Sequence, residues 1–284
     1  MATGASEFVD KTIADGVFSP DKWAKEVLRA TEANLVFAKN VNRQFEDAAD
    51  VGRTVKVASI GNLAARAKTE NTAIVYETIA ETAITITLNV WDYAAVGVED
   101  IVKVQSQVDI QNEYQRKIGY ALAKDIDTNL AALVSGFSQV QGTLGTLFTD
   151  DQVRRCVQYL DDADAPEDER VIIMAPAEKN DKIALDRWSN SLYRGNTTAV
   201  QKGQIGSEIY GLTPYVTTNT KAQAGGQSDN TVMHKEAVAL VIQREPRMHA
   251  FYDIDFFTWK VAAEVIFGSA EMRDAFGTWL KGAR

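Results

Sequence analysis

Apolar and polar residues alternate from Ile79 to Val90, and this period of two is typical of a β-strand with one buried face. An earlier run, Thr54 to Ala58, predicts the partner strand, and the charged stretch from Asn62 to Asn71 predicts a solvated tip between the two. These segments together predict an extended β-hairpin. A two-stranded ribbon alone is only marginally stable in water, so we expect other surfaces to cover its apolar side. That side carries Ile84, Ile86, Leu88 and Val90.

Two helices are predicted in the first half of the chain. Ser19, Pro20 and Asp21 form a favourable helix start, and a partly apolar stripe that includes Trp23 favours a helix as far as about Lys39. A second helix is predicted to open at Val98 and to continue for more than about 30 residues, because apolar residues follow at helical spacing. Its apolar positions are Ile101, Val104, Val108, Ile118, Leu122, Ile126, Leu130 and Leu133.

The second half of the chain predicts mixed α/β structure. Thr149 and Gln152 have the spacing of a capping box and predict the start of a helix. A wholly apolar run, Val171 to Met174, predicts a short buried strand, and Pro176 predicts the first turn of a helix that continues to Trp188. The buried face of the first of these helices is predicted to carry Val153, Cys156, Val157 and Leu160.

Two polar, glycine-containing stretches, Asn190 to Ser207 and Ala222 to Asn230, predict long loops. Loops of this length in a compact domain commonly carry a function. Apolar residues return between Trp259 and Phe267 and again near the C-terminus. Further strands are predicted around Ile209, at Tyr215 to Thr217 and at Ala237 to Ile242.

The chain of 284 residues has an ordinary globular composition but a formal net charge of -9. Wrapping nucleic acid through its phosphates requires clustered Lys and Arg, so the acidic balance argues against that function. One cysteine, Cys156, cannot form an internal disulfide or a cysteine-based zinc site. No stretch reaches the ~18 consecutive apolar residues of a membrane helix, and the first residues lack a secretory signal pattern. We therefore expect a soluble, unexported chain with no membrane partner.

Motifs for common enzymatic chemistry are absent from the sequence. It contains no G-x-S-x-G, no P-loop and no H-E-x-x-H motif. Gly203 to Ser207 has the glycines of a phosphate-binding loop but lacks the lysine, and the acidic run Asp161 to Glu169 lacks the glycine hinge of an EF-hand loop. His234 and His249 have no triad companions. We expect no catalytic residues, no cofactor, no metal site and no enzymatic activity.

Five segments carry a resemblance to a known family. They are Glu32 to Arg43, Val51 to Val57, three short matches at 113–114, 120–123 and 125–127, Ile209 to Asn219 and His234 to Leu240. Each pattern is short, and the order and spacing of the set give it weight. Over nearly its whole length the chain resembles the major capsid protein of tailed bacteriophages, which has the Hong Kong 97-type fold.

The resemblance implies an α+β fold with a defined division of the chain. It implies an N-terminal arm over 1–50, an extended E-loop hairpin over 51–97 and a P-domain with a long spine helix over 98–147. The A-domain would occupy most of 148–250, and 251–284 would return to the P-domain and A-domain. In such shells the A-domain meets its symmetry mates at the fivefold and quasi-sixfold axes, and the E-loop lies across an adjacent subunit.

The resemblance also implies function and partners. The chain would form pentamers and hexamers of an icosahedral phage head that encloses double-stranded DNA without sequence-specific binding. It would be made in the bacterial host cytoplasm and reside in the virion, together with a portal and, in some heads, decoration proteins. No long charged extension precedes the predicted arm helix, which implies a separate scaffolding protein. Lys68 has no recognisable asparagine partner, so noncovalent rather than isopeptide stabilisation is expected.

Candidate contacts between subunits follow from this reading. The hairpin tip offers Arg66, Lys68 and Glu70, and a neighbouring spine offers acidic residues as partners. Two other functions stay open from the residues alone, an encapsulin-like cellular nanocompartment and a soluble α/β enzyme with its site in 148–250. The acidic candidates are Glu99, Asp100, Asp109 and Glu113, and the apolar candidates are Trp23, Ile84, Ile86 and Leu88.

Overall fold

A computed structural model describes residues 35–49, 52–60, 65–74, 76, 81–99, 110–189, 208–220, 222–223 and 226–284. Most of the predicted N-terminal helix, including Trp23, lies outside these residues, as do Asp100, Asp109 and the predicted loop 190–207. For Glu99 and Glu113 the structure describes the backbone only.

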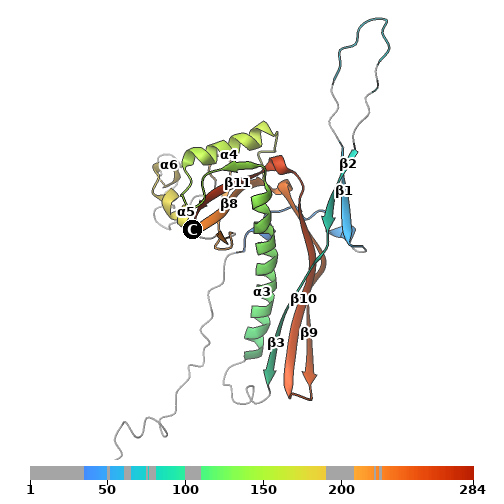
Figure 1. Cartoon of the computed structure of the whole chain (residues 1–284), viewed down its shortest axis with the longest axis vertical. Helices are drawn as coiled ribbons and strands as arrows, with labels where there is room; N and C mark the ends of the chain where they lie inside the picture. Colours follow the sequence, from blue (N-terminus) through green and yellow to red (C-terminus); the bar gives the residue numbers. More distant parts are fainter. Residues whose placement is uncertain are drawn as a thin grey trace, which may run out of the picture.

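The described strands form three sheets (Figure 1). A two-stranded sheet pairs β1 (Thr54–Ile60) with β2 (Glu81–Thr87). A three-stranded antiparallel sheet has the order β3 (Val90–Glu99), β10 (Thr258–Glu271) and β9 (Val238–Asp253). A mixed six-stranded sheet has the order β4 (Gln139–Gln141), β11 (Gly277–Ala283), β8 (Gln227–His234), β5 (Arg170–Met174) and β6 (Thr213–Val216), and β7 (Ala222–Gln223) pairs with β8.

The described helices are α3 (Ile110–Leu133), α4 (Asp150–Asp162), α5 (Pro176–Ile183) and α6 (Asp186–Ser189). Short 3₁₀ turns are η1 (Phe37–Lys39), η2 (Glu46–Ala49), η3 (Val134–Gly136), η4 (Lys235–Ala237) and η5 (Asp274–Phe276).

The predicted hairpin is confirmed. Strands β1 and β2 are antiparallel, with Val55 opposite Ile86 and Val57 opposite Ile84. Alternation sets which side is buried, since Ile86 and Leu88 are 0% and 6% exposed while Thr85 and its polar neighbours are exposed. The hairpin projects away from the rest of the molecule, with its tip at one extreme of the structure (Figure 1).

The base of the hairpin is nevertheless covered by the chain itself, which corrects the expectation that its whole apolar side needs outside cover. Ile86 and Leu88 belong to a small apolar cluster with Ala239 and Val241 of β9. The side-chain amide of Gln243 donates to the carbonyl oxygens of Ala49 and Gly52, at 3.0 and 2.9 Å. These contacts fix where the hairpin leaves the body.

Gly268 allows the hairpin strand to pass close to β10. A Cβ atom at this position would lie 2.3 Å from the carbonyl oxygen of Thr87, which is a backbone atom and cannot swing aside. Only glycine therefore fits at this crossing.

The long helix begins later than predicted. Val98 and Glu99 are the last residues of β3, where Val98 pairs with Trp259, and the described helix α3 begins at Ile110. With 24 residues, α3 is about 36 Å long at 1.5 Å per residue. Its predicted apolar stripe is confirmed further along. The buried members are Ile118, Leu122, Ile126 and Leu130.

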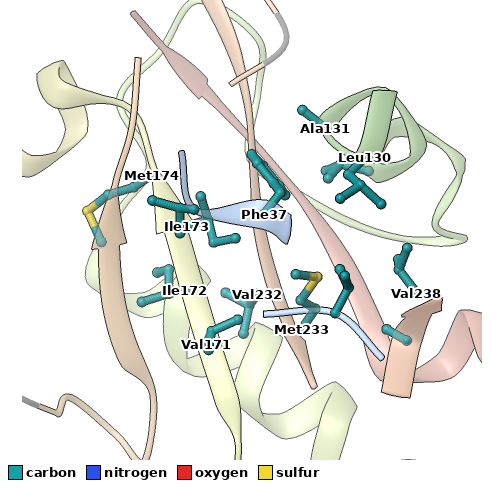
Figure 2. Packing of buried hydrophobic residues seen from close by; sticks show 14 of the residues in the cluster. Phe37, Leu130, Ala131, Val171, Ile172, Ile173, Met174, Val232, Met233 and Val238 are labelled. Atoms are coloured by element: carbon teal, nitrogen blue, oxygen red, sulfur yellow. The ribbon is translucent and has the colours of Figure 1, made fainter. Parts of the chain in front are cut away.

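Helix α3 lies along the three-stranded sheet (Figure 1), and its buried residues belong to the same apolar core as residues of both larger sheets. Val261, Ala263 and Val265 of β10 are at most 5% exposed on the covered face. Figure 2 shows the adjoining part of the core, where Phe37 lies between Leu130 of α3 and Ile173 of β5. The N-terminal stretch of the described chain is thus built into the core rather than lying on it.

The six-stranded sheet confirms several local predictions and corrects others. The Thr149–Gln152 capping box is present, β5 is wholly buried, and Pro176 begins α5. Helix α5 ends at Ile183 instead of continuing to Trp188, which belongs to the separate short helix α6.

The predicted loop 222–230 is largely strand. Strand β8 begins at Gln227, and its polar residues Ser228, Asp229 and Asn230 are fully buried. They are tolerated because each has a partner: Ser228 donates to the carbonyl of Ala283, Asp229 accepts from the indole of Trp279, and Asn230 accepts from the amide of Ala175. The strand predicted at 237–242 is also much longer, because β9 extends to Asp253.

Candidate assembly surfaces

The hairpin tip is exposed and braced by its own lysine. Arg66, Lys68 and Glu70 are all exposed. The ammonium of Lys68 donates to the carbonyl oxygen of Thr69 at 2.7 Å and also to that of Thr72, which holds the chain in a turn around Asn71 with its positive φ of 57°. The Lys68 side chain therefore stabilises the turn at the tip and also places a positive charge there.

The two predicted acidic partners whose backbone is described, Glu99 and Glu113, lie far from this tip within one copy. Glu99 ends β3 and Glu113 lies in the first turn of α3, at the end of the molecule opposite the hairpin tip (Figure 1). A contact between the tip and these residues can therefore form only between copies.

The predicted apolar contact residues divide into two groups. Ile86 and Leu88 are buried in the chain's own cluster, so they do not supply the exposed surface that we expected of them. Ile84 is half-buried and faces a hollow at the base of the hairpin.

Sequence reasoning missed an exposed apolar feature of the described chain, the turn between β9 and β10. Its large apolar side chains are 59–72% exposed, and Lys260 of β10 forms an ion pair of 2.5 Å with Asp253 beside them. The sequence contains a signal for this surface, because residues 251–257 are a run of aromatic and apolar residues around two aspartates. We call this surface the apolar turn, and it consists of Phe251, Ile254, Phe256 and Phe257.

A second exposed surface lies on the face of the three-stranded sheet away from α3. Trp91 and Tyr93 of β3 are 69% and 76% exposed. The indole of Trp91 donates to Glu264 at 2.9 Å, and Arg244 of β9 forms an ion pair with the same carboxylate at 3.2 Å. These two contacts lower the pKa of Glu264, with the indole hydrogen bond as the larger cause. The result is an exposed aromatic and charged face in which the carboxylate of Glu264 has partners on both flanking strands.

Two carboxyl pairs lie at contacts between elements, one between α3 and β3 and the other between β10 and η5. Burial and a hydrogen bond with Asp92 of β3 raise the pKa of Asp125 on α3 to about 6. Burial and a hydrogen bond with Asp274 likewise raise the pKa of Glu271 to about 7.

Chemistry of other kinds finds no support in the described part of the chain. Its His, Cys, Asp and Glu residues form no group of three or more that could hold a metal ion. Among the described helices, none has the length and apolar character needed to cross a membrane. Cys156 is buried, and burial raises its pKa to about 12.

Comparison with known proteins identifies the fold. No protein-family model and no curated protein sequence matches the chain. A structure from Mycobacterium phage Che8 is similar with a TM-score of 0.81 and 22% identity, over 93% of this chain and 97% of that one. The mature capsid of bacteriophage PhiM1 gives 0.72 and 14% over 93% and 91%. The capsid of cyanophage P-SCSP1u gives 0.70 and 16% over 96% and 94%.

These similarities confirm the predicted α+β capsid-type fold. Each covers more than nine-tenths of both chains, so the similarity extends over nearly the whole fold and is not confined to one part of it.

Proposed function

We propose that this protein is the major capsid protein of a tailed bacteriophage, which assembles as pentamers and hexamers into an icosahedral head. The observation that carries the proposal is the match of the whole fold to phage capsid structures. These neighbours do not favour a nanocompartment or a soluble enzyme.

The exposed surfaces explain how such a subunit would hold a shell together. Burying the apolar turn would remove on the order of 500 Å² of apolar surface, a gross gain of roughly 12 kcal/mol at ~25 cal/mol per Å². Association costs consume much of this gain, so one contact is weak. Repetition around closed symmetry axes makes a stable wall from such contacts.

The partners follow from this function. Packaged double-stranded DNA would be enclosed without sequence-specific binding, in keeping with the net charge of -9. A separate scaffolding protein would guide assembly, a portal would occupy one vertex, and decoration proteins would bind outside. The chain would be made in the bacterial cytoplasm and end in the virion.

The tip of the hairpin would fix the register between neighbouring subunits. Arg66 and Lys68 would face Glu99, Asp100, Asp109 or Glu113 of an adjacent copy. We expect Lys68→Glu to block assembly and a second change of the correct acid to Lys to restore it, as measured by electron microscopy of particles. Failure of every pair to rescue assembly would remove this part of the proposal.

Assembly of the purified full chain tests the function itself. We expect negative-stain microscopy to show closed particles, alone or after addition of a crowding agent, and sedimentation to show a species far above 31.2 kDa. Because a scaffolding protein is proposed to guide assembly, the same measurements are repeated on chain expressed together with the neighbouring gene products, and a single species of protomer mass there as well would refute the proposal.

A further inference from the structure

Gln243 of β9 is the extra residue of a β-bulge. Ile266 of β10 lies opposite Arg244, and Phe267 lies opposite Ile242, so the shift of register leaves Gln243 with no opposite residue on β10. A bulge of this kind interrupts the ladder and re-aims a side chain. The direction of the Gln243 side chain is therefore not set by the regular pairing of the sheet.

The Gln243 side chain contacts the root of the hairpin. Its amide nitrogen donates to the carbonyl oxygen of Ala49 at 3.0 Å and to that of Gly52 at 2.9 Å. A primary amide carries two N–H donors, so these contacts use both of them. The two acceptors come just before β1, which begins at Thr54. One side chain of the body thus holds two points of the chain that leads into the hairpin.

Apolar packing supplies a different kind of contact at the same root. Ile86 and Leu88 of the hairpin strand and its exit pack with Ala239 and Val241, which precede Gln243 on β9. Such packing is non-directional, so by itself it leaves rotation of the hairpin weakly restrained. Hydrogen bonds weaken steeply when their angle changes. The apolar cluster therefore acts as a pivot, and the amide of Gln243 acts as a strut that fixes the angle.

A small rotation at the root is amplified at the hairpin tip, which lies at one extreme of the molecule (Figure 1). Thr54 and Asn71 are 17 positions apart in the sequence, a length of chain that spans at most roughly 60 Å. A rotation of about 10° would then move the tip by up to roughly 10 Å. A displacement of that size would break any hydrogen bond or ion pair between Lys68 and a neighbouring copy.

We propose that Gln243 is a positioning residue for assembly. Its carboxamide sets the angle between the hairpin and the body, so that successive copies meet in one geometry and close shells of uniform size. This inference rests on the proposed function, because the angle matters only where the hairpin of one copy meets another copy. Sequence reasoning did not single out Gln243, since its role depends on a bulge and on partners almost 200 positions away.

Two substitutions remove the donors of Gln243 without shortening the side chain. Gln243→Met has a similar length and no N–H group, and Gln243→Glu keeps the shape but only accepts hydrogen bonds when it is ionised at pH 8. Gln158→Glu is the matched control, because it makes the same chemical change at an exposed position of α4.

Spin labels in dilute, unassembled protomers report the angle of the hairpin. One label is attached at Thr82→Cys, an exposed position at the far end of β2, and the other at Asp162→Cys, the exposed last residue of α4. The native Cys156 is buried and stays unlabelled. We expect pulsed electron paramagnetic resonance to give a distance distribution at least about twofold wider in both Gln243 variants than in the wild type and the control.

Electron microscopy of assembled particles reports the consequence for the shell. We expect the wild type and Gln158→Glu to form particles of one diameter. Both Gln243 variants should form no closed particles, or particles whose diameters spread at least about twofold more widely.

Several results would overturn the inference and leave the proposed function standing. Distance distributions equal to that of the wild type would do so, whatever the particles look like, and so would uniform closed particles from variants with widened distributions. Unfolding of both variants, seen by circular dichroism, would also overturn it, because Gln243 would then be required for the fold rather than for an angle. Absence of wild-type shells, even with the neighbouring gene products, would refute the proposed function and the assembly role of Gln243 with it.

Discussion

Replacement of the buried Glu178 carboxyl should change how stability depends on pH. Glu178 of α5 is 0% exposed and accepts hydrogen bonds from the amides of Ala283, at 2.8 Å, and Phe148, at 3.2 Å. It thereby ties the last strand of the chain to the segment that precedes α4. Burial is the main cause that raises its pKa from 4.5 to about 7, against the opposing effects of these hydrogen bonds and of Lys182.

The sign of the effect follows from linkage. Below pH 4.5 the carboxyl of Glu178 is protonated in both states and contributes no dependence on pH. Between pH 4.5 and about 7 the unfolded state releases the proton while the folded state keeps it, so the folded state loses stability as pH rises. The separation of about 2.5 pH units corresponds to about 3 kcal/mol at 1.36 kcal/mol per unit. Above about pH 7 the folded state has lost the whole of this contribution to its stability.

Urea unfolding of unassembled protomers from pH 4 to 8 measures this loss. Glu178→Gln resembles the protonated acid, so we expect its free energy of unfolding to fall by about 3 kcal/mol less than that of the wild type over this range. Glu271 and Asp125 also have raised pKa values, but they are unchanged in the variant and cancel in the difference. The exposed Glu167→Gln serves as control and should keep the wild-type slope. Identical slopes for wild type and Glu178→Gln would refute the reasoning.

Three further substitutions test the packing and the surfaces. Ile86→Ala should lower the free energy of unfolding of the protomer by about 2–5 kcal/mol in urea, because Ile86 is fully buried. Thr85→Ala at the exposed neighbouring position should change the free energy of unfolding by less than about 0.5 kcal/mol. Equal effects of the two substitutions would contradict the account of the hairpin base. Gly277→Ala should lower the free energy of unfolding by about 1–3 kcal/mol or more in the same assay, because the new Cβ would lie 2.3 Å from the ring of Phe137. An unchanged urea midpoint would contradict this close packing. Phe256→Ser should leave the free energy of unfolding unchanged, since the side chain is 70% exposed, but reduce particle yield in light scattering; wild-type yield would exclude the apolar turn as a contact.

Local sequence patterns determined the elements whose signals lie within a few residues. The hairpin followed from alternation, the start of α4 from a capping box, the start of α5 from Pro176 and β5 from an unbroken apolar run. Each of these depends on neighbouring side chains and on backbone geometry, so a single segment contains the information. The order of the segments also carried the resemblance to capsid proteins, which the shared fold supports.

Tertiary structure decided what the same patterns left ambiguous. Val98 fits a helix or a strand by spacing, and its pairing with Trp259, distant in sequence, makes it strand. The polar residues at the start of β8 predict a loop when taken alone, yet hydrogen bonds with residues outside β8 allow them to be buried inside the sheet. Ile86 and Ile84 have the same side chain and the same periodicity, but β9 covers only the first completely. Sequence sets which face of an element is apolar, because that depends on residue order; what covers the face depends on segments that only folding brings together.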